Sequence, residues 1–264
     1  MSERGPSELV RVEMSDGVCT ITLDRPEARN ALNTALLRAS AAALEAAEGD
    51  DDVDVIVLTG ADPAFCAGLD LKELASGGAN LVGGQPDDGA RWSNPIQAVW
   101  EMIKPVIGAV NGACVTGGFE LALGCDFLVA SDRARFGDTH ARVGVTPGGG
   151  MSVFLPMAVG LRKAKEMTLT GNFVDGAEAH RLGLVNHVVP HAELMPTAQR
   201  LARDIAANDG RAVRHLKHLY DHNARLPVGD ALAHEQEIFR TYRVDFDAIE
   251  ERRQSVVERG RSQR

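Results

Sequence analysis

The sequence predicts an α/β fold followed by a helical C-terminal region. Through about residue 190, short apolar segments alternate with segments whose apolar residues recur at helical spacing. From Pro196 onward only the helical spacing remains. Two of the apolar segments, at 53–60 and 105–110, run into turns rich in glycine and small residues. We therefore expect a core domain at 1–195 and a helical region at 196–264.

The individual elements follow from the spacing of apolar residues. Val18–Leu23 alternates apolar and polar side chains, as a half-buried strand does. Leu32–Ala47 repeats apolar residues at helical spacing and stops before Gly49, which predicts a helix. Further strands are expected at 53–59, 105–110, 126–130 and 184–189, and helices at 198–207, 212–222, 229–242 and 246–258. The apolar faces of these last helices need a surface to cover them.

Composition and charge exclude several classes of function. The chain of 264 residues is 44% hydrophobic, which is enough to bury a full core. Its net charge is -9 and Lys and Arg form no stripe, so we expect no binding to nucleic acid or to an anionic membrane. No apolar run approaches the roughly 20 residues that span a bilayer, and the N-terminus lacks the pattern of a secretion signal. We therefore expect a cytoplasmic protein.

The cysteines give no sign of a metal site or of a disulfide framework. Cys19, Cys66, Cys114 and Cys125 lie in or beside apolar strands and glycine turns. Their spacing is not that of metal ligands, and four are too few to hold a chain of this length together by disulfides. We expect them to be small buried side chains, and we predict no metal site.

The segment 111–120 is the most informative part of the chain. It follows the apolar run at 105–110, contains the pair Gly117-Gly118, and ends at Glu120, where a helix is expected to open. Glycine lets the backbone turn sharply and approach a ligand, and the first turn of a helix has unpaired amides with partial positive charge. A turn of this kind is suited to bind an oxyanion.

A second turn follows the strand expected at 53–59. Phe65–Lys72 continues as a short strand and a turn of small residues. Backbone donors from the two turns are able to converge on one oxygen atom. The segment 75–90, rich in Gly, Asp and Asn, follows as a loop that is either a substrate-facing flap or simply solvated.

Six motifs, in order along the chain, resemble those of the enoyl-CoA hydratase/isomerase (crotonase) superfamily. They lie at 23–32, 65–70, 104–112, 117–120, 134–137 and 144–150, so the resemblance covers nearly the whole chain. It implies that the core is a crotonase-type spiral of ββα turns. It also implies that the helical region makes the contacts of a homotrimer, or of a hexamer built from two trimers. The sequence shows no internal repeat that would prove the spiral independently.

The resemblance implies roles for individual residues. The backbone N–H groups of Leu69 and Gly117 correspond to an oxyanion hole, which stabilises negative charge on the thioester oxygen of an acyl-CoA. Glu120 corresponds to a catalytic glutamate, although a carboxylate in the first turn of a helix also suits the helix dipole. His140 stands where hydratases usually have a second glutamate. The two-glutamate mechanism therefore does not transfer directly.

His140 leaves three interpretations open. As an imidazolium it is able to deliver a proton to Cα while Glu120 activates water, which gives syn hydration. Alternatively, one of these two residues alone shuttles a proton between carbons, as in an isomerase. The third interpretation is a hydrogen-bonded pocket residue without a chemical role.

The resemblance also places the coenzyme part of the substrate. It implies that Arg25 and Lys72 approach the phosphates, and that backbone at Ala28, Ala67 and Asp70 surrounds the adenine and pantetheine. Each of the two basic side chains is equally compatible with a solvated surface charge. Because phosphate-loop and dinucleotide-binding patterns are absent from the sequence, we expect no cofactor beyond the coenzyme A of the substrate.

The sequence thus predicts an enoyl-CoA hydratase-like lyase of fatty acid metabolism, which adds water to a 2-enoyl-CoA thioester through an enolate. A crotonase-fold enoyl-CoA isomerase is the nearest alternative. An acyl-CoA decarboxylase or hydrolase, and an acyl-CoA-binding protein without turnover, are the others. Chain length, branching and stereochemistry are not predicted.

Overall fold

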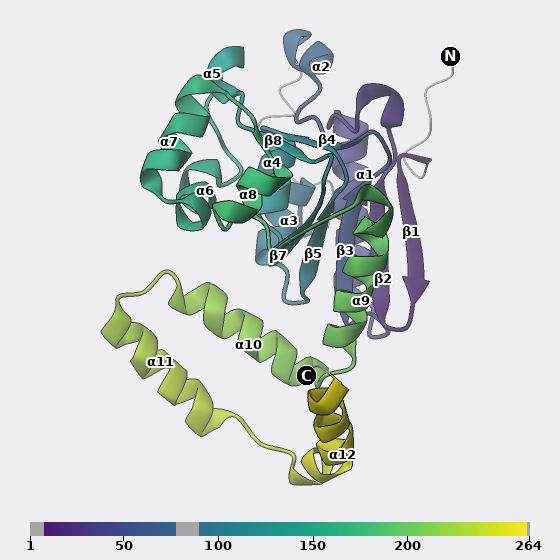
Figure 1. The fold of residues 1–264 in the computed structure, drawn as a ribbon, viewed down its shortest axis with the longest axis vertical. Helices are drawn as coiled ribbons and strands as arrows, with labels where there is room; N and C mark the ends of the chain where they lie inside the picture. The colour runs from purple at the N-terminus through teal and green to yellow at the C-terminus, as the bar shows by residue number, and fades with distance from the viewer. Residues whose placement is uncertain (1–7, 78–89, 263–264) are drawn as a thin grey trace. The chain divides into compact units, whose positions relative to one another are not determined.

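The computed structural model describes residues 8–77 and 90–262. They fall into two compact units, Met1–Arg214 and His215–Arg264, each with its own internal contacts (Figure 1). Most of the loop predicted at 75–90 lies outside the described residues.

The larger sheet of the first unit holds most of the predicted strands. Its order, among the described residues, is β1 (Val10–Ser15), β2 (Val18–Leu23), β3 (Val55–Gly60), β5 (Val106–Val110), β7 (Phe127–Ser131) and β10 (His187–Val189). The pair β1–β2 is antiparallel, and the neighbours that follow are parallel. Parallel neighbours require crossover connections, which here include the second sheet and the helices.

The smaller sheet explains the course of those crossovers. Its order is β4 (Ala64–Cys66), β6 (Ala113–Val115), β8 (Arg135–Gly137) and β9 (Val174–Asp175). The successive pairs β3–β4, β5–β6 and β7–β8 each place one strand in each sheet. The helices that follow these pairs are α2 (Leu71–Ala75), α4 (Gly117–Leu123) and α5 (His140–Val143). This repeated course confirms the predicted spiral of ββα turns.

Two predictions about strands need correction. The strand predicted at 184–189 is present only at 187–189, because Leu184 N–H donates to the Ala179 carbonyl in a turn after α8 (Gly176–Arg181). The strand β2 is buried along its whole length rather than on one face. Its outer face is covered by α9 (Leu194–Ala206), as Figure 1 shows. Gln199 of this helix donates a hydrogen bond to the hydroxyl of Thr20.

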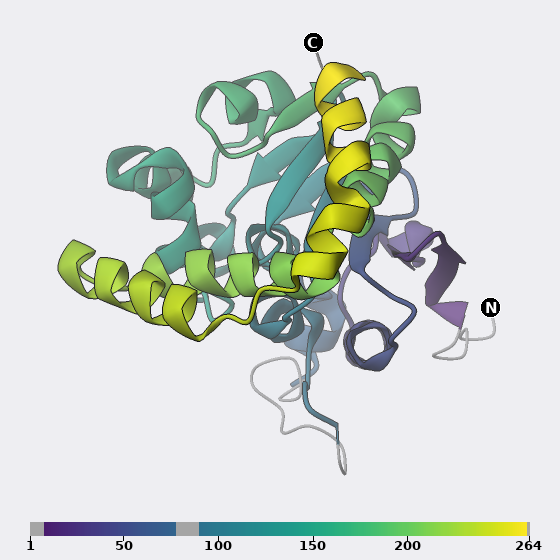
Figure 2. The same ribbon diagram turned by 90° about the horizontal axis from the view of Figure 1, so that it is seen from below.

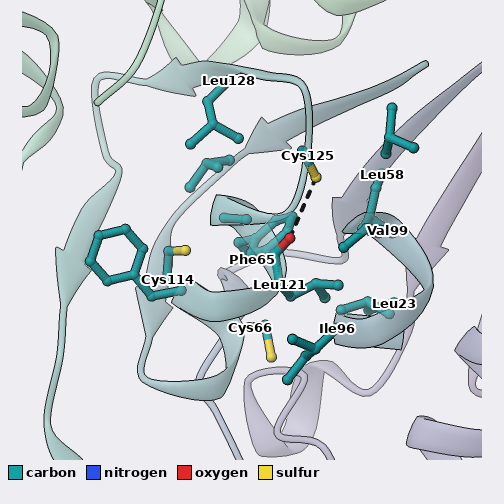
Figure 3. Close-up of a cluster of buried hydrophobic side chains, with 14 of the residues drawn as sticks. Leu23, Leu58, Phe65, Cys66, Ile96, Val99, Cys114, Leu121, Cys125 and Leu128 are labelled. Atoms are coloured by element: carbon teal, nitrogen blue, oxygen red, sulfur yellow. Dashed lines mark hydrogen bonds between the residues drawn. The ribbon is translucent and has the colours of Figure 1, made fainter. Parts of the chain in front are cut away.

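The main core lies between the larger sheet, the smaller sheet and the helices α1 (Thr34–Gly49), α3 (Pro95–Glu101) and α4. Figure 3 shows Phe65, Val99 and Leu121 of this core beside buried cysteines. All four cysteines lie among the described residues, where they are buried, as predicted, and form no disulfide. Burial raises the pKa of the Cys66 thiol to about 12, so this thiol stays protonated.

The remaining helices of the first unit follow the strand β8. They are α6 (Met151–Val159), α7 (Leu161–Thr170) and α8, which precede β10 and α9. The helix α9 packs its buried Leu194, Ala198 and Ala202 against β3, β5 and β7, where they form a second, smaller core. The predicted helix at 198–207 thus belongs to the compact first unit. The functional division into residues 1–195 and 196–264 stays a prediction.

The second unit contains the end of α10 (Gly210–Asn223), α11 (Val228–Thr241) and α12 (Phe246–Ser262), which confirms the helices predicted there. In both views α11 runs alongside α10 (Figures 1 and 2), and the rings of His222 and His234 are 4.3 Å apart. Among the described residues, no helix combines the length and the apolar character needed to cross a membrane.

Candidate active site

Two turns that are far apart in the sequence meet at the start of α4. A Cβ atom added to Gly117 would lie 3.6 Å from the nitrogen of Leu69, and one added to Gly68 would lie 3.4 Å from the nitrogen of Gly117. Within the described part of the chain, the N–H groups of Leu69 and Gly117 donate no hydrogen bond to the protein. The structure therefore brings the two predicted oxyanion donors together with their hydrogen-bonding capacity unused.

A cavity of about 770 Å³ adjoins these turns. Leu69, Glu120 and His140 all line it. Its apolar lining includes Leu37, Leu74, Ile96, Trp100, Val143 and Val145. A concave, largely apolar cavity with a few converging polar groups is the usual form of a small-molecule site.

Glu120 lies in the first turn of α4 and is 4% exposed. Its Oε1 atom accepts hydrogen bonds from the backbone N–H of Gly149, at 2.7 Å, and of Met151, at 3.5 Å. Burial raises the pKa of Glu120 above its usual value, and these hydrogen bonds and His140 only partly oppose the rise. A Cβ atom on Gly149 would come within 2.9 Å of the carboxylate. The close approach of this loop therefore depends on glycine.

His140 begins α5 and is 6% exposed. Its Nε2 atom lies 3.9 Å from Oε2 of Glu120, which is too long for a direct hydrogen bond. Its Nδ1 atom lies 2.6 Å from Oδ1 of Asp138. The two predicted acid/base residues are thus neighbours in the cavity, and a third titratable group stands behind the imidazole.

Asp138, Thr168 and Gly149 were not predicted as residues of this site. Asp138 has one local signal, because it directly follows the strand β8, and functional side chains often follow strand ends in α/β folds. Thr168 in α7 and Gly149 in the loop before α6 carry no such signal. They reach the site only through the folding of later segments back onto it.

Thr116 connects the oxyanion turn to the histidine. It has φ 49° and ψ -109°, in a region that β-branched residues rarely adopt. Its Oγ1 atom lies 2.6 Å from Oγ1 of Thr139 and accepts a hydrogen bond from the Thr139 N–H at 3.0 Å. The residue before Gly117 is thereby tied to the residue before His140.

The residues predicted to hold the coenzyme lie around α2. Arg25 donates from Nη1 to Oδ2 of Asp70 at 2.6 Å. Asp70 caps the N-terminus of α2, because its Oδ1 atom accepts a hydrogen bond from the N–H of Lys72. Burial opposes ionisation of Asp70, but the hydrogen bonds outweigh it and hold its pKa below the usual value. The side chain of Lys72 is exposed, whereas Ala28 and Ala67 are partly buried.

Of the five predicted coenzyme-binding residues, Ala67 lines the described cavity. Arg25 is a partner in an ion pair rather than a solvated surface charge. Lys72 is the exposed cation of the set.

Comparisons with known proteins agree with one another. The family profile described as enoyl-CoA hydratase/isomerase matches residues 13–263. A probable peroxisomal enoyl-CoA hydratase of Arabidopsis thaliana is 36% identical over 92% of this chain and 89% of its own length. A probable enoyl-CoA hydratase of Rhizobium meliloti is 40% identical over 89% of each protein.

The solved structures give the same result. The enoyl-CoA hydratase of Mycobacterium tuberculosis H37Rv has a TM-score of 0.72 and 48% identity, and the match covers 89% of this chain and all of that one. The enoyl-CoA hydratase of Mycobacterium smegmatis has a TM-score of 0.72 and 47% identity, with 88% and 96% covered. With this fold, these turns and these matches, the chain belongs to the enoyl-CoA hydratase/isomerase family.

Proposed function

We propose that this protein is an enoyl-CoA hydratase that adds water to a 2-enoyl-CoA thioester. The observation that carries the proposal is the convergence of two acid/base side chains, Glu120 and His140, with the backbone donors of Leu69 and Gly117 beside one apolar cavity. The names of the similar proteins support the same activity.

The backbone donors stabilise the intermediate. When a nucleophile adds to Cβ of the enoyl thioester, negative charge develops on the thioester oxygen. The N–H groups of Leu69 and Gly117 donate to that oxygen, and because they are held in place beforehand they stabilise the enolate without reorganisation. The position of Gly117 in the first turn of α4 adds the partial positive charge of the helix end.

The side chains move the protons. Glu120 removes a proton from water as the hydroxyl adds to Cβ, and His140, as the imidazolium, gives a proton to Cα. The raised pKa of Glu120 makes it a stronger base than an ordinary carboxylate. Because hydration needs no electron acceptor and the enolate is stabilised by amides, we propose that the reaction needs no cofactor.

For the coenzyme, we propose that Lys72 supplies most of the attraction to the phosphates. Its exposed ammonium stands at the start of α2, whereas the charge of Arg25 is balanced by Asp70. Arg25 and Asp70 then act by holding α2 in place, and the backbone at Ala28 and Ala67 provides the wall against which adenine and pantetheine lie.

For the assembly, we propose a homotrimer, or a hexamer of two trimers, that acts in the cytoplasm. The second unit exposes large apolar side chains that a monomer would leave in water: Leu216, Tyr220, Val228, Leu232, Phe239, Phe246 and Ile249. Apolar surface of this extent on helices is typical of an interface.

Mass-spectrometric turnover of a panel of acyl-CoA thioesters tests the activity. We expect conversion of 2-enoyl-CoA to 3-hydroxyacyl-CoA, unchanged by a chelator. Migration of the double bond in 3-enoyl-CoA without hydration would indicate the isomerase instead. Release of CO2 or of free thiol would indicate a decarboxylase or hydrolase, and thermal stabilisation by acyl-CoA without any product would indicate a binding protein.

A further inference from the structure

The second acid/base residue of this site is not an isolated histidine. Asp138 is fully buried directly behind it, at the end of β8. Its Oδ1 atom accepts from Nδ1 of His140 at 2.6 Å and from the His140 backbone N–H at 3.1 Å. Its Oδ2 atom accepts from the hydroxyl of Thr168 at 2.7 Å. A buried carboxylate requires such partners, and here each oxygen has at least one.

These hydrogen bonds determine which nitrogen of His140 handles protons. Burial opposes ionisation of Asp138, but hydrogen bonds from His140 and Thr168 outweigh it, so its pKa lies below the usual value. An ionised carboxylate only accepts hydrogen bonds, so Nδ1 of His140 must carry a hydrogen in both charge states of the ring. The nitrogen that gains and loses a proton is therefore Nε2, which faces Glu120 at 3.9 Å.

The charges in the site follow from this arrangement. When His140 is protonated, its positive charge cancels that of ionised Asp138, and the pair is neutral. The glutamic acid that hydratases usually have at this position is likewise neutral while it carries the proton that it donates. The net charge of the site is then that of Glu120 alone.

Resting on the proposed hydratase function, we propose that Asp138 and His140 work as one unit that replaces the second glutamic acid usual in hydratases. Asp138 is the positioning residue of this unit, and Nε2 of His140 is its proton donor. In hydration, the C–O bond to Cβ forms as water loses a proton to Glu120. The Nε2–H bond breaks as its proton forms the new C–H bond at Cα, and His140 is left neutral with hydrogen on Nδ1. Return of the proton from Glu120 to Nε2 restores the starting state.

The proposal predicts that Asp138→Asn damages catalysis through the histidine. The amide of asparagine is able to donate to Nδ1, so the neutral ring then carries its hydrogen on Nε2, and the charge that stabilises the imidazolium is gone. We expect kcat to fall by roughly 10²- to 10⁴-fold, the usual effect of losing a positioned proton donor. We also expect the decline of the rate at alkaline pH to begin at lower pH than in the wild type.

Thr168→Val is the matched control. It removes one hydrogen bond to Asp138 but keeps the carboxylate and its contact with Nδ1. We expect a smaller loss of kcat with the pH profile nearly unchanged. Asp138→Asn with normal kcat and an unmoved alkaline decline would overturn the proposal.

A double substitution tests the unit directly. In His140→Glu, a glutamic acid would share its proton with the buried carboxylate of Asp138 instead of donating it to Cα. We expect this single variant to be as poor as His140→Ala, and we expect the addition of Asp138→Asn to raise its kcat by at least 10-fold. Equal activity of His140→Glu with and without Asp138→Asn would show that the two residues do not act together.

One measurement separates this proposal from the hydratase assignment. The ¹⁵N chemical shifts of the His140 ring report which nitrogen carries hydrogen, and they need no turnover. We expect hydrogen on Nδ1 of the neutral ring in the wild type and on Nε2 in Asp138→Asn. Hydrogen on Nε2 in the wild type would refute the role of Asp138 even if hydration is confirmed. The expected shifts without hydration would refute the hydratase assignment alone.

Discussion

Glu120 is buried, and its burial raises its pKa above the usual value. Glu120→Gln keeps a side-chain oxygen that accepts from Gly149 but removes the base. We expect kcat to fall by about two to four orders of magnitude while acyl-CoA still raises the melting temperature. Glu13→Gln, on the exposed strand β1, is the control and should leave both quantities unchanged. Normal turnover by Glu120→Gln would remove Glu120 from the mechanism.

The raised pKa of Glu120 also has a consequence for stability. A carboxyl group whose pKa is higher in the folded than in the unfolded protein contributes stability below its unfolded pKa and loses this contribution as pH rises through the folded pKa. Glutamine has no such loss. The Tm of Glu120→Gln minus that of the wild type should therefore increase from acidic to neutral pH, as measured by thermal unfolding. A difference that is constant with pH would contradict the shift.

Thr116 holds a backbone conformation that normally belongs to glycine. Its φ of 49° with ψ of -109° costs a β-branched residue about 1–3 kcal/mol. Thr116→Gly relieves this strain, whereas Thr116→Ala keeps a Cβ atom and still loses the hydrogen bond to Thr139. The strain of about 1–3 kcal/mol exceeds the usual unfolded-state cost of glycine of about 0.4–1 kcal/mol. We therefore expect the glycine variant to be the more stable of the two by about 1 kcal/mol in chemical denaturation.

The control for Thr116 is an alanine with ordinary helical geometry. Ala42 is exposed in the middle of α1, so Ala42→Gly should be destabilising by about 1 kcal/mol, the opposite order. If alanine is better than glycine at both positions, then Thr116 is not strained in solution.

Among the elements, the short helix α2 depends on a single carboxylate. Asp70 accepts from the N–H of Lys72 and of Glu73, and Glu73 in turn accepts from the N–H and hydroxyl of Thr34 at the start of α1. The first turn of one helix is thus linked to the first turn of another. A helix of five residues has little stability of its own, so it depends on such contacts.

Asp70→Ala should therefore release α2. We expect a loss of about 0.5–2 kcal/mol for the cap alone, and weaker binding of acyl-CoA if α2 carries Lys72 to the phosphates. Asp70→Asn keeps an accepting oxygen and should retain most of the stability.

The pKa of Asp70 is lower in the folded protein than in the unfolded chain. The contribution of Asp70 to stability is therefore present above its unfolded pKa and is lost as pH falls through its folded pKa. Denaturation at several pH values checks both points, and equal stability of the alanine variant would contradict the cap.

For the whole molecule, the exposed apolar side chains of the second unit lead to a prediction about assembly. Phe239 on α11 is 82% exposed and Tyr220 on α10 is 79% exposed. Full burial of a phenylalanine contributes about 1.5–3 kcal/mol, so several such residues in each subunit would stabilise a trimer substantially. We expect light scattering to show a trimer or hexamer at micromolar concentration, and Phe239→Asp to lower the measured mass.

Ala233→Asp is the control for this prediction. It places the same carboxylate on an exposed position of α11 about 120° around the helix from Phe239. It should leave the assembly intact. A monomeric wild-type protein would contradict the trimer without affecting the chemistry proposed for the cavity.

Local patterns in the sequence determined a large part of this structure. The strands β3, β5 and β7, the helix α1 and the helices of the C-terminal region lie close to their predicted positions. The glycine turn before Glu120 was also predicted, because sharp turns and helix starts depend on neighbouring residues alone. The motifs added the family and, through it, the spiral of ββα turns.

Contacts between distant segments were decided only by the tertiary structure. Alternation in β2 could not show that α9 covers its second face, since that helix comes about 170 residues later in the sequence. His140 was predicted without a partner. Asp138 is only two residues away in the sequence, but the fold turns its carboxylate toward the imidazole and brings Thr168, 30 residues further on, to its other oxygen. Whether an imidazole is a solvated base or part of a buried pair depends on which groups packing brings within about 3 Å, and no local pattern encodes that distance.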